Sequence, residues 1–232
     1  MREYGRIIMN RHLFLFGGGP PFTYKMARKF SELVSVRTGK ISFLIIDRPN
    51  WKEYLAKYTK KLIENGITEF QFIPLLTISE KDAVELLKNS AGIIIGGGNT
   101  EQYAKYIVET SLSRILQEQF SAGVPIAGFS AGALISMEHC IISANDNEDQ
   151  VFKWQTGLGL LKNTVIAVHF SEWMDENHLR KAVIKFQPHV HFGIDEGTGM
   201  YFYNNRLMAV EGNNVYQINN NRLEKMEKIN FL

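Results

Sequence analysis

The feature of this chain that most constrains its fold is a repeated alternation of short apolar runs with helical patterns. Apolar runs of strand length occupy residues 12–16, 41–46, 70–74, 91–95 and 124–129. Apolar residues recur at helical spacing over residues 24–34, 51–65, 79–89, 101–120 and 131 to about 139. Strands that are apolar along their whole length and alternate with helices are typical of a parallel sheet buried under helices on both faces.

The last third of the chain has a different pattern. Residues 164–168 form one more apolar run, and beyond about residue 190 short runs are separated by turn sequences such as Asp195-Glu196-Gly197 and Gly212-Asn213-Asn214. Turn residues at such short intervals indicate antiparallel hairpins, which we place at the edge of the sheet. We therefore predict one α/β domain over residues 1–232, with a mostly parallel sheet flanked by helices and C-terminal antiparallel hairpins.

Composition argues against several classes of protein. The chain has 26 basic and 24 acidic residues, a net charge of +2, which gives no reason to expect nucleic acid or an anionic membrane as a partner. Its single cysteine and six histidines show no zinc-site spacing, so we expect no metal and no cofactor. No apolar run approaches the roughly 20 residues of a membrane span, and the first residues lack a signal-peptide pattern, so we expect a cytoplasmic protein.

The segment with the most chemical information is residues 123–133, where an apolar run ends in Gly128-Phe-Ser130-Ala-Gly132 and a helical pattern begins. A nucleophile on a tight strand-to-helix turn sits in strained backbone, and the residues two positions away must be small. The first amides of the helix then face the serine oxygen, and that of Ala131 is one expected oxyanion-hole donor. We predict that Ser130 is a nucleophile. The alternative is that the glycines only permit close packing and Ser130 caps the helix.

Serine is a poor nucleophile without a general base. His169 directly follows the apolar run 164–168, at the carboxyl end of a strand, where the active sites of parallel sheets lie. We predict that it is the base, with His178 as the second choice.

An orienting carboxylate is expected between the nucleophile and the base in chain order. The acidic segment 144–149 supplies Asp146, which we predict for this role, and Glu148, which is the alternative. The competing interpretation is a solvated acidic loop.

A second glycine run, Gly96-Gly97-Gly98-Asn99-Thr100, also follows a strand and opens a helix. Its amides are suited to a phosphate or an oxyanion, but the lysine of a P-loop and the full dinucleotide-binding spacing are missing. A second oxyanion donor from Gly97 or Gly98 is therefore favoured over nucleotide binding. The run 17–19 either lines the same crevice or is only a tight turn.

Together these motifs resemble the serine peptidases of the dipeptidase E and cyanophycinase group. The matching segments are Ile95-Gly-Gly-Gly-Asn-Thr100, Gly128-Phe-Ser130-Ala-Gly132, His169-Phe-Ser171 and Gly193-Ile-Asp-Glu-Gly197. The resemblance implies a fold like the class I glutamine amidotransferase domain. It also implies that Ser130 is the nucleophile, His169 the base, Asp146 of the Asn145-Asp146 pair the acid, and Gly98 and Ala131 the oxyanion donors.

Two branches of this group differ in substrate: dipeptidase E removes N-terminal aspartate from dipeptides, and cyanophycinase cuts β-aspartyl-arginine from a storage polymer. Cyanophycinases carry a Gln near the glycine loop and an Asp-Gln before the catalytic His, where this chain has Thr100 and Ala167-Val168. We therefore expect a serine peptidase that hydrolyses small peptides with N-terminal Asp through an acyl-enzyme. The alternatives are a β-aspartyl peptidase and a non-enzymatic small-molecule binding protein.

An acidic substrate side chain needs a cationic partner. Arg180 is our candidate, with Arg48 or Lys153 as alternatives. Glu196 either recognises a substrate amine or is only a turn residue, and we also assign Gly97, Asn99 and Thr100 to the substrate site. The expected partner is a small peptide, and a homodimer remains open.

Overall fold

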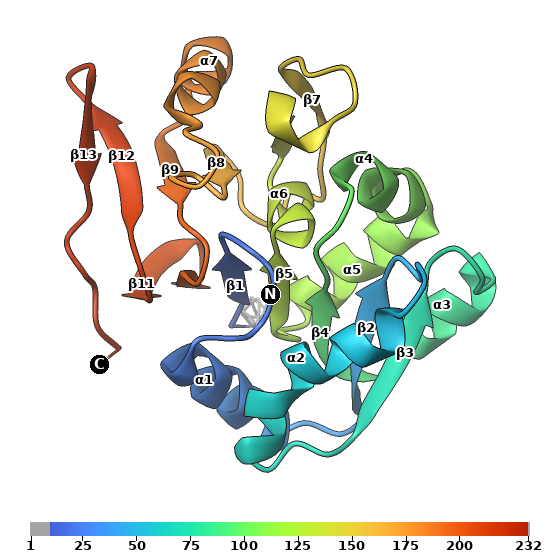
Figure 1. Ribbon diagram of the computed structural model, residues 1–232. Coiled ribbons are helices and arrows are strands. Elements are labelled where there is room, and N and C mark those ends of the chain that lie inside the picture. The colour runs from blue at the N-terminus through green and yellow to red at the C-terminus, as the bar shows by residue number, and fades with distance from the viewer. Residues whose placement is uncertain (1–9, 232) are drawn as a thin grey trace, which may run out of the picture.

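A seven-stranded sheet forms the centre of the computed structural model, which describes residues 10–231 (Figure 1). Its strands are β1 (His12–Phe16), β2 (Lys40–Ile45), β3 (Phe70–Pro74), β4 (Ser90–Ile95), β5 (Ile126–Phe129), β10 (Gly199–Tyr203) and β11 (Arg206–Glu211). The order is β11-β10-β1-β5-β4-β2-β3. The five strands from β1 to β3 are parallel, and β10 and β11 add an antiparallel edge.

Helices cover both faces of this sheet because successive side chains of each strand point to opposite sides. On one face, Phe14 and Phe16 of β1 share a buried cluster with side chains of α1 (Tyr24–Ser35) and α2 (Trp51–Glu64). On the other face, Leu13 and Leu15 share a cluster with side chains of α3 (Glu80–Lys88), α4 (Thr100–Tyr103), α5 (Ser111–Ser121) and α6 (Ala131–Ser136). The predicted mostly parallel sheet with helices on both faces is confirmed.

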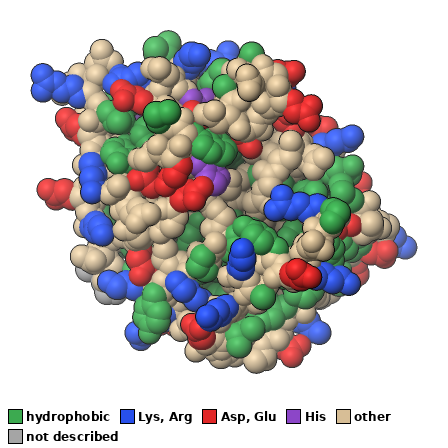
Figure 2. Space-filling view, viewed as in Figure 1, with side chains coloured by type: hydrophobic (Ala, Val, Ile, Leu, Met, Phe, Trp, Pro, Cys, Tyr) green, Lys and Arg blue, Asp and Glu red, His purple; other side chains and the backbone are tan. Residues whose placement is uncertain are grey.

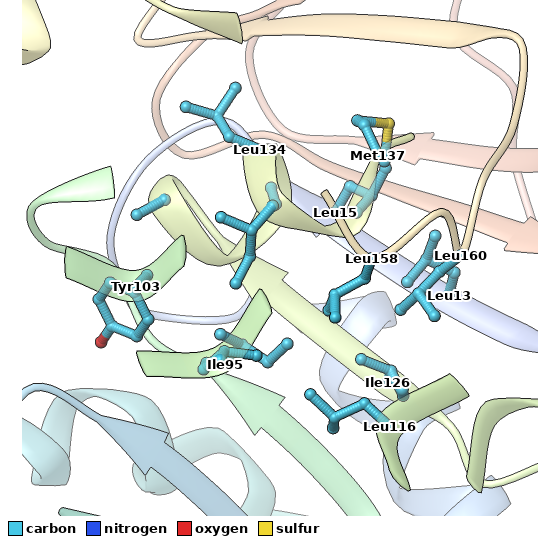
Figure 3. Packing of buried hydrophobic residues seen from close by; sticks show 14 of the residues in the cluster. Leu13, Leu15, Ile95, Tyr103, Leu116, Ile126, Leu134, Met137, Leu158 and Leu160 are labelled. Atoms are coloured by element: carbon cyan, nitrogen blue, oxygen red, sulfur yellow. The ribbon is translucent and has the colours of Figure 1, made fainter. Parts of the chain in front are cut away.

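The short helix α6 lies directly over the middle of the sheet. Figure 3 shows Leu134 of α6 and Met137 just beyond its end above Leu15 of β1 and Ile126 of β5. These side chains are almost completely buried, and burying one of this size contributes about 1.5–3 kcal/mol. The packing fixes the start of α6, and with it the turn from β5, relative to the carboxyl ends of β1 and β4.

A second sheet stands beside the first and has the strand order β13-β12-β9-β8. Its strands are β8 (Thr164–Val168), β9 (Val190–Ile194), β12 (Val215–Asn219) and β13 (Arg222–Lys225). Strands β8 and β9 are parallel and are connected by α7 (Glu176–Phe186). A hairpin of β6 (His139–Ile142) and β7 (Lys153–Thr156) lies above α6 in Figure 1. Phe192 and Ile194 of β9 belong to the same buried cluster as Leu13, so the two sheets share a core.

Two local predictions were wrong. The predicted helix over 101–120 is divided into α4, a π-helical turn (Ala104–Val108) and α5, because Thr110 adopts extended backbone and its side chain bonds the backbone on both sides. The predicted helix from residue 131 ends at Ser136, and His139 begins β6, where Ile141 and Ile142 favour a strand. The predicted strand over 164–168 is present as β8, in the second sheet. Of the C-terminal hairpins, β10–β11 lies at the edge of the first sheet as predicted, and β12–β13 belongs to the second.

Within residues 10–231, no helix is both long enough and apolar enough to cross a lipid bilayer.

Candidate active site

Ser130 stands alone between a strand and a helix. β5 ends at Phe129 and α6 begins at Ala131, and Ser130 itself has φ 48° and ψ −109°. Its amide donates to the carbonyl oxygen of Phe16, the last residue of β1, at 3.0 Å. A non-glycine residue in such backbone costs about 1–3 kcal/mol, so the surrounding structure must hold it there. The sharp turn that the sequence indicates is therefore present.

The two glycines around Ser130 are required by close backbone contacts. A Cβ at Gly128 would collide with the carbonyl group of Gly132, and a Cβ at Gly132 would collide with the carbonyl oxygen of Ile95. Small residues two positions on either side of Ser130 let the helix begin this close to β4 and β5. The spacing of the motif thus follows from packing, and the packing leaves Ser130 at the carboxyl end of the sheet.

His169 meets Ser130 from the second sheet. It follows β8, has φ 49°, and donates its amide to the carbonyl oxygen of Gly17 at 2.7 Å. Its Nε2 lies 2.8 Å from Ser130 Oγ, although the two residues are 39 positions apart. Trp173 stacks on the imidazole with ring centroids 4.3 Å apart. The structure therefore brings together the predicted nucleophile and the predicted base.

Glu196 lies on the other side of the imidazole, with Oε1 2.5 Å from Nδ1 of His169. The reason is the parallel register of β8 and β9, in which Val168 pairs with Ile194, so the residues that follow leave at the same edge. Asp195 fixes the turn by accepting hydrogen bonds from the amide of Ser171 at 3.0 Å and from another side chain. A carboxylate on Nδ1 selects the tautomer in which Nε2 accepts the hydroxyl proton of Ser130.

Asp146 does not make the predicted contact with His169. Its Oδ2 accepts a hydrogen bond from the hydroxyl of Thr100 at 2.5 Å, and no hydrogen bond between residues 10 and 231 joins it to His169. Asp146 ends a 3₁₀ turn (Ala144–Asp146) that faces the glycine loop rather than the second nitrogen of the imidazole. The alternative acid, Glu148, is exposed and makes no hydrogen bond within the same described range.

Burial raises the pKa of Asp146 from 3.8 to about 6. The hydrogen bond from Thr100 and the nearby His169 oppose this rise in pKa, and the charges of Glu101 and Asp175 add to it. The pKa of Asp175 is also raised by burial. Two partly buried aspartates with raised pKa values therefore lie near His169.

The glycine loop after β4 passes directly beside Ser130. A Cβ built on Gly97 would lie 3.4 Å from Ser130 Cβ. The amide of Gly97 is engaged, because it donates to the hydroxyl of Tyr58 at 3.0 Å. In the described part of the chain, the amides of Gly98 and Ala131 donate to no protein acceptor. Of the predicted amide donors, Gly98 and Ala131 are thus available to an oxyanion and Gly97 is not.

Two predicted substrate residues have structural partners. Asn99 caps α4, since its Oδ1 accepts from the amide of Gln102 at 2.8 Å. Thr100 is completely buried and uses its hydroxyl on Asp146. Both side chains therefore shape the glycine loop in this structure.

The predicted cation for an acidic substrate, Arg180, is already engaged. Its guanidinium bonds the carboxylate of Glu176 at 2.6 and 2.8 Å and the side-chain oxygen of Asn221 at 2.8 Å. Lys153, one of the alternatives, forms ion pairs with Glu101 and Asp149. The second choice for the base, His178, is buried in α7 beside Phe152.

Arg48 differs from these cations. It is exposed, makes no ion pair with any residue in the range 10–231, and lies 5.8 Å from the ring centroid of Tyr54. Tyr54 packs edge-on against Tyr58, whose hydroxyl contacts Gly97. The charge of Arg48 also opposes the burial that raises the pKa of Tyr58. Arg48 is therefore a cation at the rim of the glycine loop that is available to a ligand.

His169 and Glu196 differ in their exposure to solvent. The side chain of His169 is 14% exposed and that of Glu196 is 52% exposed. Figure 2 shows a histidine near the middle of this face with a group of acidic side chains beside it.

A comparison with protein families matches residues 17–210 to the model described as Peptidase family S51. A Peptidase E of a Nostoc species is 22% identical over 223 residues, which cover 90% of this chain and 89% of that protein. A cyanophycinase of Trichormus variabilis is 25% identical over 150 residues, 60% of this chain and 50% of that protein. The chain thus spans about half the length of the cyanophycinase it matches.

Solved structures show the same fold. A peptidase from an acI-B1 actinobacterium has a TM-score of 0.71 and 22% sequence identity, with 98% of this chain and all of that chain covered. A structure titled as a Peptidase E protein of Listeria monocytogenes has a TM-score of 0.65 and 18% identity, with 88% of this chain and 98% of that chain covered. At these identities the likeness supports the fold alone.

Proposed function

Because this chain belongs to peptidase family S51, we propose that it is a serine peptidase that cleaves small peptides, above all dipeptides with N-terminal aspartate, through an acyl-enzyme on Ser130. The observation that carries the proposal is the hydrogen-bonded series from Ser130 Oγ through His169 to Glu196, with distances of 2.8 and 2.5 Å. A hydroxyl, an imidazole and a carboxylate in this order are the working parts of acyl transfer.

In this mechanism His169 Nε2 takes the proton of Ser130 as Oγ attacks the carbonyl carbon of the substrate. The amides of Gly98 and Ala131 hold the negative oxygen that develops, and the start of α6 favours the same charge. His169 then gives its proton to the leaving amine as the C–N bond breaks. Water, deprotonated by the same imidazole, attacks the ester and releases the acyl group from Ser130.

We assign the orienting role to Glu196 and not to Asp146. A carboxylate in direct contact with Nδ1 keeps the imidazole in the productive tautomer and stabilises the imidazolium that forms during attack. Asp146 interacts electrostatically with His169, but its hydrogen bond is with Thr100.

The preference for aspartate rests on Arg48 and on the extent of the similarity. Arg48 lies at the rim of the glycine loop with a guanidinium that is available to a carboxylate. The Nostoc Peptidase E aligns over nearly the whole of both chains, whereas the cyanophycinase aligns over half of its own length. The second candidate, a β-aspartyl peptidase, keeps support from the latter similarity. A binding protein without catalysis is disfavoured by the alignment of Ser130 with His169.

The test is Ser130→Ala together with labelling by a serine-directed fluorophosphonate. We expect hydrolysis of an Asp-Leu dipeptide to fall at least about 10³-fold and the label to be lost, with an unchanged thermal transition. Mass spectrometry should locate the label on Ser130 of the unmodified enzyme. The matched control is Ser121→Ala at the exposed end of α5, which should keep both activities. Activity or labelling that survives in Ser130→Ala would refute the proposal.

A further inference from the structure

The Asn145–Asp146 pair contacts both the glycine loop segment that holds Thr100 and the segment after β8 that holds Trp173. Asp146 accepts the hydroxyl hydrogen of Thr100, which is buried at the start of α4, two residues beyond Gly98. Asn145 Nδ2 donates to the carbonyl oxygen of Trp173 at 3.3 Å, and the indole of Trp173 stacks on the imidazole of His169. A continuous series of contacts therefore joins the glycine loop to the base.

The glycine loop needs such support because glycine has little conformational preference of its own. The hydroxyl of Tyr58 accepts a hydrogen bond from the amide of Gly97, and the hydroxyl of Tyr103 lies 3.5 Å from the carbonyl oxygen of Gly97. These contacts fix Gly97 but not the peptide that follows it. Thr100 holds the other end of the loop, and in the described structure its hydroxyl donates only to Asp146.

We propose that Asp146 is a positioning residue that holds Thr100 and thereby directs the amide of Gly98 toward the oxyanion. The inference rests on the proposed acyl transfer and deepens it. An oxyanion donor acts only within about 2.7–3.1 Å of the charge it stabilises. Since a misplacement of about 1 Å can cost about 100-fold in rate, a side chain that never touches the substrate can control turnover in this way.

The environment of Asp146 supports this role. The carboxylate is partly buried between the charges of Glu101 and Asp175, which raises its pKa. A charged acceptor makes a shorter and stronger hydrogen bond than a neutral one, which suits a contact that must keep Thr100 in one place. A charged carboxylate in such surroundings lowers the stability of the fold. The contact that it makes there is the hydrogen bond from Thr100.

The experiment compares kcat and KM for Asp-Leu hydrolysis among variants of the full chain. Thr100→Val and Asp146→Ala should each lower kcat about tenfold and leave KM unchanged, and the double variant should be no slower than either single one. Thr100→Ser should restore kcat, and Asp146→Asn should stay within about threefold of wild type because its amide oxygen still accepts. The matched control is Thr164→Val, a buried threonine at the far end of β8.

Two results would overturn the inference. The first is a Thr100→Val variant that folds and keeps wild-type kcat. The second is an Asp146→Asn variant as slow as Asp146→Ala, because the charge of the carboxylate on His169, and not its bond to Thr100, would then be what matters. The Thr100→Ser variant guards against misfolding, since it keeps the hydroxyl and fills the same buried position.

The rate of fluorophosphonate labelling separates this inference from the proposed function. If the unmodified chain neither cleaves dipeptides nor reacts with the reagent, the proposed function fails. If it does react, and Thr100→Val reacts equally fast, only the positioning role fails. The expected result is a labelling rate that falls with kcat in Thr100→Val and Asp146→Ala.

Discussion

The two halves of the site are built in different ways. Ser130 and the amides that we propose as oxyanion donors belong to the seven-stranded sheet and come from short glycine-rich turns after β4 and β5. His169 and Glu196, the proposed base and its carboxylate, belong to the four-stranded sheet, at the ends of the adjacent parallel strands β8 and β9. The first half is therefore a local structure that can be read from a motif, and the second depends on how distant strands pair.

The turn after β1 brings the halves into register. The carbonyl oxygen of Phe16 accepts the amide of Ser130, and the carbonyl oxygen of the next residue, Gly17, accepts the amide of His169. Consecutive backbone groups thus position Ser130 and His169, both of which have positive φ. The two sheets meet where strain in the backbone is held by hydrogen bonds from a third segment.

The largest expected effect lies in the second half, at the orienting carboxylate. Glu196→Gln should lower kcat about 10³-fold with little change in KM, because an amide at Nδ1 favours the wrong tautomer of His169. The matched control is Glu148→Gln, an exposed carboxylate that should have almost no effect. Steady-state kinetics on Asp-Leu would measure both. A larger loss in Asp146→Asn than in Glu196→Gln would return the orienting role to Asp146.

The contact between Glu196 and His169 shows what sequence reasoning misses. Ser130 and His169 could be chosen because each directly follows an apolar run, and strand ends gather at one edge of a sheet. An acid between them in chain order is Asp146, whose hydrogen bond goes to Thr100. The missing information was that β9 pairs in parallel with β8, so that Glu196 leaves the sheet next to His169. The signal was present as an apolar run, residues 190–194, followed by an acidic turn.

The same distinction holds for the fold. Continuous apolar runs predicted the strands of the parallel sheet, because such strands are buried on both faces. Apolar residues at helical spacing predicted most of the helices. The division into two sheets left no such mark, since residues 164–168 are as apolar as any strand of the first sheet. Thr110 likewise interrupts a helical pattern through side-chain hydrogen bonds that periodicity does not reveal.

The local character of the first half can be tested by crowding it. Gly132→Ala should lower the free energy of unfolding by about 3 kcal/mol and abolish labelling, because its Cβ would meet the carbonyl oxygen of Ile95. The control is Gly159→Ala, where φ is +64° and the space is open, with an expected cost of about 1 kcal/mol. Urea unfolding would compare the two. Equal costs would show that backbone conformation, and not close packing, explains the spacing of the glycines in the turn.

A variant of Arg48 tests whether a residue of the first half binds the side-chain carboxylate of the substrate. Arg48→Gln should raise KM for Asp-Leu about tenfold, leave kcat unchanged, and have no effect on Ala-Leu, since only a carboxylate loses its partner. Arg180→Gln is the control, because that guanidinium is engaged by Glu176 and Asn221. A larger rise in KM for the Arg180 variant would move substrate recognition to α7.

The smallest expected effect concerns the residue that joins the halves. Burial raises the pKa of Asp146 to about 6 from 3.8, so between these pH values the native state binds a proton that the unfolded chain has lost. The contribution of Asp146 to stability is therefore largest at low pH and is lost as the pH rises through about 6. His169 opposes this shift, and Glu101 and Asp175 add to it.

Asp146→Asn removes this titration and should raise the thermal midpoint by about 2 °C at neutral pH, with no gain near pH 4. Thermal unfolding of both proteins at intervals from pH 4 to 7.5 would measure the difference, with Glu148→Gln as the exposed control. Parallel curves for Asp146→Asn and wild type would mean that the carboxylate is not desolvated in the native state. A difference that opens as the pH rises would show that the chain keeps a destabilising charge beside the glycine loop, as expected if that charge serves the geometry of the site.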